Sequence, residues 1–387
     1  MSTLPQAPPK RTPRYGPSVS TTPLDDRAAE AERSVSVLFA GRLGRMPWTH
    51  LAQVVHPAPA PSRPFGWLRG EWHYWWQAHY LDAVVDAGLR ATRTGDVAAA
   101  ERHARQGDRL LLTIRLRNRD RWVNDFYDDM AWLALASGRL AALHDELGHT
   151  RTRRRLRSAA RHLTAQLRSA HTDDVGGGLF WSRDRDFKNS PATGPTALHL
   201  ARLGETDEAR ELVDWVYARL WSEDSGLVLD GIRLRDGAEV LVSDIWSYNQ
   251  GTVLGALVTF GDDRSLERAA ALVAAVDARL TVELDEVRVL RTHGGGDGGL
   301  FTGILARYLA LAASSRRLDD GARGTARRLV LDTADALWRG RGTYPVAGRR
   351  DPSVFPTEPG GPPPAPPFEL SPQLQAWTLL EAAATLT

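Results

Sequence analysis

Successive helical segments of this sequence alternate in polarity, and this alternation restricts the fold more than any other feature. Ala, Leu and Arg are abundant and alternating β-branched runs are scarce, which is typical of a helical protein. We expect about twelve helices, at residues 28–44, 67–90, 97–117, 127–147, 151–171, 190–203, 205–221, 244–260, 264–282, 297–314, 319–339 and 370–385. A charged face, which predicts a peripheral position, is found at 97–117, 151–171, 205–221, 264–282 and 319–339. A more continuously apolar surface, which predicts an interior position, is found at 67–90, 127–147, 190–203, 244–260, 297–314 and 370–385.

The interior segments recur about every 50–70 residues, and each begins with a polar or aromatic cluster. Six helical hairpins with six inner helices predict an all-α fold, an (α/α)6 barrel in which these clusters converge at one end. The alternative is an open α-solenoid, in which the clusters would spread along a groove. Short strands bounded by turn residues are expected in the loops, at residues 176–181 and 226–231.

The chain of 387 residues, 42% of them hydrophobic, is long enough to bury a large core. We expect a single barrel domain over residues 27–387. Residues 1–26 are rich in Pro, Ser and Thr and lack the apolar stretch of a secretory signal, which predicts a disordered arm and a cytoplasmic location. No run of about 18 apolar residues occurs, so no membrane span is expected.

Composition also restricts the possible partners. Positive and negative charges nearly balance, which gives no reason to expect nucleic acid as a partner. The absence of cysteine excludes disulfides and thiolate metal sites. The histidines show no metal-binding spacing, and the chain has no phosphate-binding or dinucleotide-binding motif, so we expect no metal and no cofactor. We also expect a monomer.

Two adjacent carboxylates, Asp128 and Asp129, stand where a loop turns into the apolar segment 127–147. Asn124 or Asp125 is expected to cap this helix. One interpretation is that acidic residues in a first turn only complement the helix dipole. The other is glycoside hydrolysis, which needs one carboxylate at the anomeric carbon and one carboxylic acid at the leaving oxygen. Neighbouring carboxylates also raise each other's pKa, which keeps one of them protonated near neutral pH.

The stretch Tyr-Asp-Asp-x-x-Trp-x-Ala-x-Ala, at residues 127–136, resembles the catalytic motif of glycoside hydrolase family 76, the α-1,6-mannanases. Four further stretches resemble the same family in the same order, at residues 74–78, at 177–181 with 187–189, at 248–251 and at 301–309. The resemblance spans about residues 67–385 and implies an (α/α)6 barrel. It also implies that Asp128 is the nucleophile and Asp129 the general acid/base.

The predicted substrate-binding residues lie in the same clusters. They are Trp75, Gln77, Tyr127, Trp181, Lys188, Asn189, Tyr248, Asn249, Gln250 and Phe301. Trp75 and Trp181 either stack on sugars or belong to the core. Lys188 and Asn189 either bind sugar hydroxyls, or Asn189 caps a helix and Lys188 is solvated. The cluster at 248–250 either binds sugar or forms a buried polar network that ties adjacent inner helices together. Asp297 is expected to be a loop residue.

We therefore predict a retaining hydrolase of α-1,6-linked mannan or manno-oligosaccharide that works by double displacement. One alternative is a sugar isomerase or epimerase on the same barrel, which usually uses histidine bases. The other is a non-catalytic glycan-binding protein that keeps the cleft.

Overall fold

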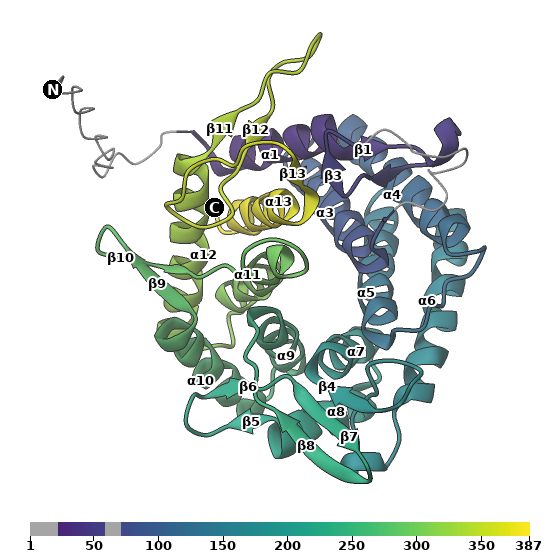
Figure 1. The fold of residues 1–387 in the computed structure, drawn as a ribbon, viewed down its shortest axis with the longest axis vertical. Coiled ribbons are helices and arrows are strands. Elements are labelled where there is room, and N and C mark those ends of the chain that lie inside the picture. The colour runs from purple at the N-terminus through teal and green to yellow at the C-terminus, as the bar shows by residue number, and fades with distance from the viewer. Residues whose placement is uncertain (1–21, 59–70) are drawn as a thin grey trace, which may run out of the picture.

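The computed structural model describes residues 22–58 and 71–387, and two concentric rings of helices make up most of these ranges (Figure 1). The inner ring consists of α3 (Tyr74–Arg93), α5 (Tyr127–Glu146), α7 (Ser190–Leu203), α9 (Ser247–Phe260), α11 (Gly298–Ser314) and α13 (Leu370–Ala384). The outer ring consists of α1 (Leu24–Phe39), α4 (Val97–Arg117), α6 (Thr150–Ala170), α8 (Thr206–Arg219), α10 (Asp263–Arg279) and α12 (Asp320–Gly340). Each inner helix packs against the next, and α13 packs against α3, so the inner ring is closed. The predicted (α/α)6 barrel is confirmed and the open solenoid is excluded.

Burial follows the polarity of the segments. Every residue of α13 is buried, whereas α10 buries one stripe and exposes the rest. An inner helix touches neighbours on all sides, so a polar face would have no water to contact. An outer helix needs only one apolar stripe, which explains why the charged segments lie outside.

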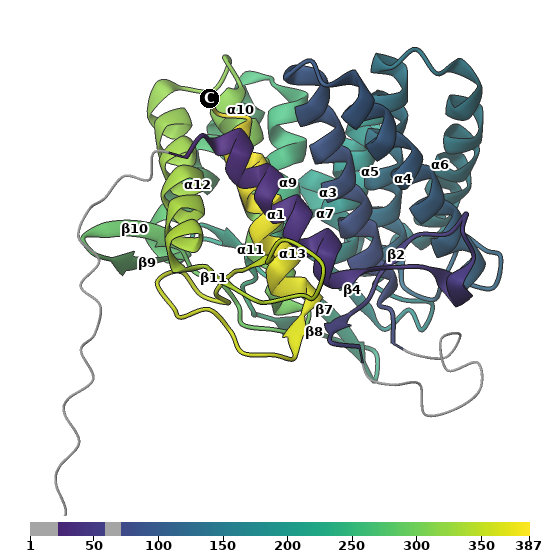
Figure 2. The same cartoon turned by 90° about the horizontal axis from the view of Figure 1, so that it is seen from above.

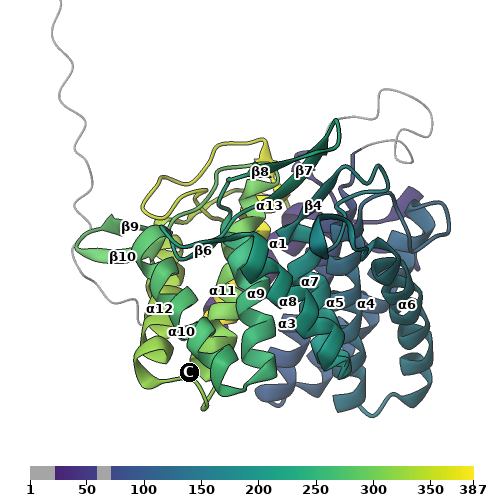
Figure 3. The same ribbon diagram turned by 90° about the horizontal axis from the view of Figure 1, so that it is seen from below.

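All six inner helices begin at the same end of the barrel, and the short strands gather there, opposite the C-terminus (Figures 2 and 3). The strands pair as β1 (Ala40–Gly41) with β2 (Leu51–Ala52), β3 (Val55–His56) with β13 (Phe368–Glu369), β5 (Trp221–Ser222) with β6 (Leu227–Val228), β9 (Thr281–Leu284) with β10 (Val287–Leu290), and β11 (Gly342–Thr343) with β12 (Ser353–Val354). The largest sheet is antiparallel and has the order β4 (Phe187–Asn189), β7 (Gly231–Arg235), β8 (Ala238–Val242). This end of the barrel therefore carries the loops that can form a site.

Three glutamines attach these loops to the inner helices, each from the fourth residue of its helix. The amide of Gln77 bonds the backbone N–H and C=O of Ala52, both at 2.9 Å. Gln250 bonds both backbone groups of Val228 at 2.8 Å, and Gln373 does the same to a loop residue at 355. A side-chain amide reproduces the pairing of a strand edge, so each buried backbone group has a partner.

Several boundaries differ from the prediction. Helix α1 begins at Leu24, so the end of the predicted arm is helical, while residues 1–21 lie outside the described ranges. The stretch 176–181 is not a continuous strand, because Gly177 and Gly178 have φ of 123° and 70°. A Cβ at Gly178 would lie 2.6 Å from the Trp215 ring, so this turn requires glycine. The hairpins β7–β8 and β9–β10 were not expected.

Within the described ranges, no helix combines the length and the apolar character that crossing a bilayer requires.

Candidate active site

A cavity of about 450 Å³ opens where the inner helices begin. Aromatic side chains form most of its wall, and these are His73, Tyr74, Trp75, Phe126, Trp132, Trp181, Phe187, Trp246, Tyr248 and Phe301. Four carboxylates and one guanidinium face the same space, namely Asp128, Asp129, Asp230, Asp297 and Arg233. Flat apolar rings with a few charged groups are suited to a ligand that has apolar faces and a polar rim.

Asp128 and Asp129 occupy the first turn of α5, and both are partly exposed to the cavity. The predicted cap is wrong: Phe126 is the N-cap and caps no N–H with its side chain. Asn124 instead accepts a hydrogen bond from the Phe126 N–H at 3.1 Å and donates its amide N–H to Asp129. Asp128 Oδ1 is buried and has no hydrogen-bond partner among the described residues. A buried acceptor left unpaired costs free energy, which is typical of an atom reserved for a ligand.

The two carboxyl groups differ in what surrounds them. Burial raises the pKa of Asp128 to about 7, although hydrogen bonds from the backbone and from Trp181 lower it. Burial raises the pKa of Asp129 well above its ordinary value, and the charge of Asp128 raises it further. Only the hydrogen bond from the Asn124 side chain lowers it. Asp128 has more donors to stabilise its anion, so we expect it to ionise first and Asp129 to keep the proton.

Asp297 is a site residue that the sequence analysis assigned to a loop. It is the N-cap of α11, but its carboxylate makes no cap hydrogen bond. The indole N–H groups of Trp75 and Trp76 both donate to Asp297 Oδ1, at 3.1 and 2.9 Å. These two bonds orient the carboxylate in the cavity wall, where its charge raises the pKa of both Asp128 and Asp129.

Asp230, just before β7, was also missed. The Asn249 amide N–H donates to Asp230 Oδ1 at 3.2 Å, and burial raises the Asp230 pKa to about 6. Arg233 lies on β7 itself, with its guanidinium 4.2 Å from the centre of the Phe187 ring. An acidic and a basic side chain from β7 and the residue before it therefore line the cavity.

The predicted aromatic residues meet at the cavity. Tyr248 and Phe301 stack at 4.1 Å between ring centres with an interplanar angle of 19°. Trp75 lies 6.3 Å from Phe301, and Trp181 lies 5.0 Å from Phe126. Trp75, Trp181, Asn189, Tyr248 and Phe301 all line the cavity, so the structure brings these candidates together with the two aspartates.

Five predicted binding residues are not among those that line the cavity: Gln77, Tyr127, Lys188, Asn249 and Gln250. Gln77 and Gln250 use their amides on backbone groups, so their predicted substrate contact is replaced by a structural role. Tyr127 is buried, and its N–H donates to the Trp181 carbonyl at 2.7 Å. Asn249 contacts the cavity wall through its hydrogen bond to Asp230.

For Lys188 the sequence predicts either a sugar ligand or a solvated residue, and the structure excludes the solvated one. Its side chain is fully buried, and Nζ donates to the carbonyls of Thr172, Gly177 and Gly178. A buried ammonium needs acceptors for its three N–H groups, and this glycine turn supplies them. Asn189 both lines the cavity and caps α7, because its Oδ1 accepts from the Ala192 N–H at 3.1 Å.

Although four aspartates face the cavity, no group of three or more His, Asp or Glu side chains in residues 22–58 and 71–387 has an arrangement that would hold a metal ion. His73 is the one histidine in the cavity wall over the same ranges, and it stacks on Trp76 at 4.3 Å. That the protein needs no metal or cofactor remains a prediction.

Comparisons with known proteins agree with this geometry. The model of glycosyl hydrolase family 76 matches residues 49–343. The GH76A α-1,6-mannanase from Salegentibacter sp. HEL1_6 superimposes with a TM-score of 0.78 at 28% identity, over 94% of this chain and 100% of that chain. An inactive variant of the same enzyme, with two consecutive aspartates replaced by alanine and α-1,6-mannotetrose bound, gives 0.77 at 27% identity, over 95% of this chain and 100% of that chain. A protein from Listeria innocua gives 0.74 at 25% identity, over 94% of this chain and 98% of that chain. No curated protein matches the sequence.

Proposed function

The chain belongs to glycosyl hydrolase family 76, and we propose that it hydrolyses α-1,6-mannosidic linkages with retention of configuration. The observation that carries this proposal is the pair Asp128 and Asp129, two consecutive carboxyl groups exposed to one aromatic-lined cavity. The surroundings of the two groups differ in a way that supports a nucleophile and an acid. Hydrogen-bond donors lower the pKa of Asp128, whereas the charge of Asp128 raises the pKa of Asp129.

In the first step, the Asp128 carboxylate attacks the anomeric carbon of the mannose unit. The bond to the glycosidic oxygen breaks through an oxocarbenium-like transition state, and that oxygen takes the proton of Asp129 as it leaves. The products of this step are a mannosyl ester on Asp128, an ionised Asp129 and a shortened glycan. The unpartnered Oδ1 of Asp128 suits this role, since no protein donor needs to be displaced from it.

In the second step, ionised Asp129 removes a proton from water as the water oxygen attacks the anomeric carbon. The ester bond breaks, the electron pair returns to Asp128, and Asp129 is protonated again. Two inversions at the same carbon give net retention. Asn124 holds Asp129 in both states, because its amide orientation is fixed by the Phe126 N–H.

Substrate binding uses the remaining wall of the cavity. The apolar faces of mannose units stack on Trp75, Trp181 and the Tyr248–Phe301 pair. Their hydroxyl groups donate to the carboxylates of Asp230 and Asp297, which are already oriented by Asn249 and by the two indoles. Held in this way, the carboxylates need little reordering when the glycan binds.

The test is steady-state kinetics of Asp128→Asn and Asp129→Asn on an α-1,6-mannan and on an aryl α-mannoside with an activated leaving group. Asp128→Asn should lose about 10²-fold or more on both substrates, because attack on the anomeric carbon is lost. Asp129→Asn should lose as much on the mannan and keep the first step on the aryl mannoside, since that leaving group needs no proton. Azide should then rescue turnover of Asp129→Asn and give a product of retained configuration.

Near wild-type rates for either variant, with folding verified by circular dichroism, would remove that residue from the mechanism. The two alternatives predict different products from the same incubations. An isomerase or epimerase would convert a free sugar without releasing a shorter glycan. A binding protein would retain the mannan and cleave nothing.

A further inference from the structure

A second groove is lined by residues of the outer helices α8 and α10 and of the β5–β6 turn. These elements lie on the outside of the barrel (Figure 1). Its volume is about 600 Å³. Two ion pairs join the helices beside it, Arg210 with Asp262 and Arg268 with Asp214, both at 2.6 Å. The groove and the catalytic cavity share no lining residue.

An aromatic stack forms one wall of the groove. Tyr217 and Trp221 lie 4.8 Å apart between ring centres with an interplanar angle of 23°. The Arg268 guanidinium lies 4.1 Å from the centre of the Tyr217 ring. Trp221 stays partly exposed and has no other aromatic or cationic partner among the described residues. It therefore offers a fixed flat surface, because its position is set by the stack beneath it.

The other groove residues leave this surface accessible. Ala218 of α8 and Ala271 of α10 are exposed and line the groove, where a longer side chain would cover the ring. The Tyr217 hydroxyl is buried with no hydrogen-bond partner among the described residues. A polar atom in that state is satisfied by water or by a bound ligand.

Charge at the groove is balanced. Arg264 and Arg268 contribute two positive charges, and Asp214 and Glu223 contribute two negative charges. Arg264 and Glu223 are exposed, and neither forms an ion pair in the part of the chain that the structure describes. A balanced set of donors and acceptors beside an aromatic plane fits a neutral polyhydroxyl ligand better than an ion.

We propose that this groove is a second glycan-binding site that holds a segment of an α-1,6-linked mannose chain away from the catalytic cavity. The identity of the glycan rests on the proposed function. One mannose ring stacks on Trp221, and its hydroxyls bond Glu223 and Arg264. The site increases the local concentration of polymer at the enzyme and contributes nothing to short substrates.

Binding is tested by affinity electrophoresis in gels that contain α-1,6-mannan, with Asp128→Asn/Asp129→Asn as the background so that the polymer stays intact. Trp221→Ala removes the stacking surface, and Ala271→Glu fills the groove from an exposed helix position. Each should weaken retention by the mannan about 2- to 10-fold, the range of one aromatic contact. Ala274→Glu is the matched control, since Ala274 is exposed on the same helix and outside the groove.

Kinetics of the same groove variants in the active enzyme separate the two proposals. Ala271→Glu should lower kcat/KM on the polymer and leave kcat/KM on an aryl α-mannoside unchanged. If Ala271→Glu and the folded Trp221→Ala both keep full retention, the groove proposal is wrong. Absence of any retention by mannan also overturns it. Failure of the catalytic proposal has a different signature, the absence of cleavage of any α-mannoside by the wild-type protein.

Discussion

Carboxyl groups of the inner helices lie at both ends of the barrel, but among the described residues they are paired with arginines at only one end. The first end is the one where the inner helices begin, and the second end is the one where they finish. Helix α5 carries Asp128 and Asp129 in its first turn and Arg139 three turns later. At the first end, the carboxyl groups face a cavity, and burial raises their pKa. At the second end, Arg139 forms ion pairs with Asp82 and Asp86 of α3.

The second end is a closed network. Arg307 of α11 forms ion pairs with the same two aspartates, so two carboxylates and two guanidinium groups bridge three inner helices. Burial acts to raise the pKa of Asp82, but the charges of Arg139 and Arg307 outweigh it and hold that pKa below the ordinary value. Each charge that leaves water here gains a partner of opposite sign.

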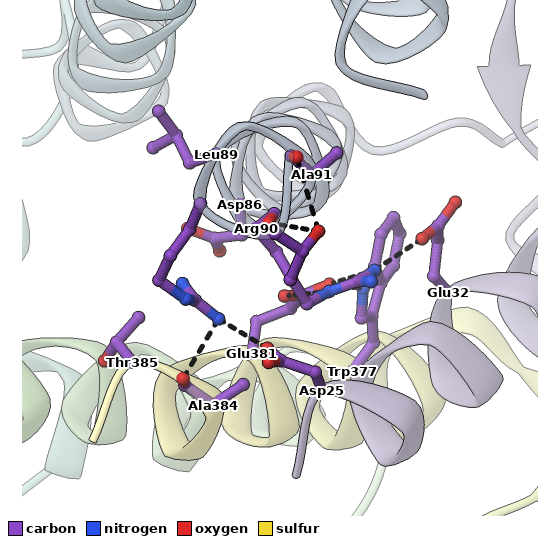
Figure 4. Close-up of polar contacts among 12 residues, drawn as sticks. Asp25, Glu32, Asp86, Leu89, Arg90, Ala91, Trp377, Glu381, Ala384 and Thr385 are labelled. Atoms are coloured by element: carbon purple, nitrogen blue, oxygen red, sulfur yellow. Dashed lines mark hydrogen bonds and ion pairs between the residues drawn. The ribbon is translucent and has the colours of Figure 1, made fainter. Parts of the chain in front are cut away.

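A related set of contacts closes the seam between the first and last helices (Figure 4). Arg90 of α3 lies between Glu381 of α13 and Glu32 of α1, at 3.0 and 2.6 Å. The Trp377 indole N–H donates to Glu381 at 2.9 Å. Burial still raises the Glu381 pKa to about 7, although Arg90 lowers it. Charged residues at this end therefore hold the ring together.

The comparison teaches that carboxylate burial alone does not identify a functional site. What separates the two ends is whether arginines accompany the carboxylates. Asp128 and Asp129 have no arginine ion pair among the described residues, whereas Asp82 and Asp86 each have two. Unpaired buried acids are costly, so they are expected where catalysis uses the raised pKa.

The largest effect on stability should come from Arg139→Met. It leaves Asp82 and Asp86 with one guanidinium instead of two, and breaking a buried ion pair costs about 3–5 kcal/mol. Chemical denaturation measures the loss in unfolding free energy. Arg115→Met is the matched control, because Arg115 pairs with Asp120 on the surface and should lose less than about 1 kcal/mol. Equal losses for the two variants would contradict a structural role for the buried network.

The barrel and the aspartate pair at one of its ends could be predicted from the sequence, whereas the ion-pair network at the other end was not predicted. The barrel follows from the alternation of apolar and charged segments, which depends only on the local pattern. Asp128 and Asp129 could be found because they are adjacent and stand at the start of a strongly apolar helical segment. The same residues also belong to the ordered set of motifs that carries the family resemblance.

Asp230 and Asp297 could not be found in this way. Each is a single aspartate in a glycine-containing loop, and sequence pattern alone does not distinguish it from an ordinary turn residue. Asp297 becomes a site residue because two tryptophans more than 200 positions away donate to it. The burial of Lys188 was not predicted for the same reason, since two of its three carbonyl partners, Gly177 and Gly178, belong to a turn whose shape the sequence pattern does not specify. A position at the start of an inner helix was the one available signal for Asp297.

The second prediction is that the stability contributions of Asp128 at the first end and Asp82 at the second end respond to pH with opposite sign. The folded pKa of Asp128 is raised to about 7, so its contribution to stability falls as pH rises from about 4 to 7. Asp128→Asn should therefore gain stability over wild type across that interval. The pKa of Asp82 is lower in the folded protein than its ordinary value. Its contribution to stability is therefore fully present when the pH is above the ordinary pKa of an aspartate, and it is lost as the pH falls below that pKa.

Denaturation curves of wild type, Asp128→Asn and Asp82→Asn between pH 3 and 8 measure this contrast. We expect changes of about 1–2 kcal/mol, because one pKa unit corresponds to about 1.4 kcal/mol and water in the cavity screens Asp128. Asp82→Asn should be destabilised most at neutral pH, with a deficit that narrows in acid. If the unfolding free energies of Asp128→Asn and Asp82→Asn change with pH in the same direction relative to wild type, the predicted difference between the two carboxyl groups is wrong.

The smallest effect concerns Asp297, whose hydrogen-bond and charge partners differ from those of the carboxyl groups at either end. It has two hydrogen-bond donors but no ion pair among the described residues, and its charge raises the pKa of Asp128 and of Asp129. Asp297→Asn keeps an oxygen for the two indole N–H groups and removes the charge. Both limbs of the pH profile of kcat/KM should then move to lower pH, by about 0.5–1 unit for a nearby charge.

The profile is measured on an aryl α-mannoside and on a manno-oligosaccharide. A shift on both substrates is expected from the lost charge, whereas a higher KM on the oligosaccharide alone would mean that Asp297 only binds a hydroxyl. Asp125→Asn is the control, because Asp125 is exposed beside the same helix start and does not line the cavity. An unchanged profile in Asp297→Asn would leave burial and the Asp128–Asp129 pair as the causes of the raised pKa values, and the proposed chemistry of the cavity would then depend on two carboxylates instead of three.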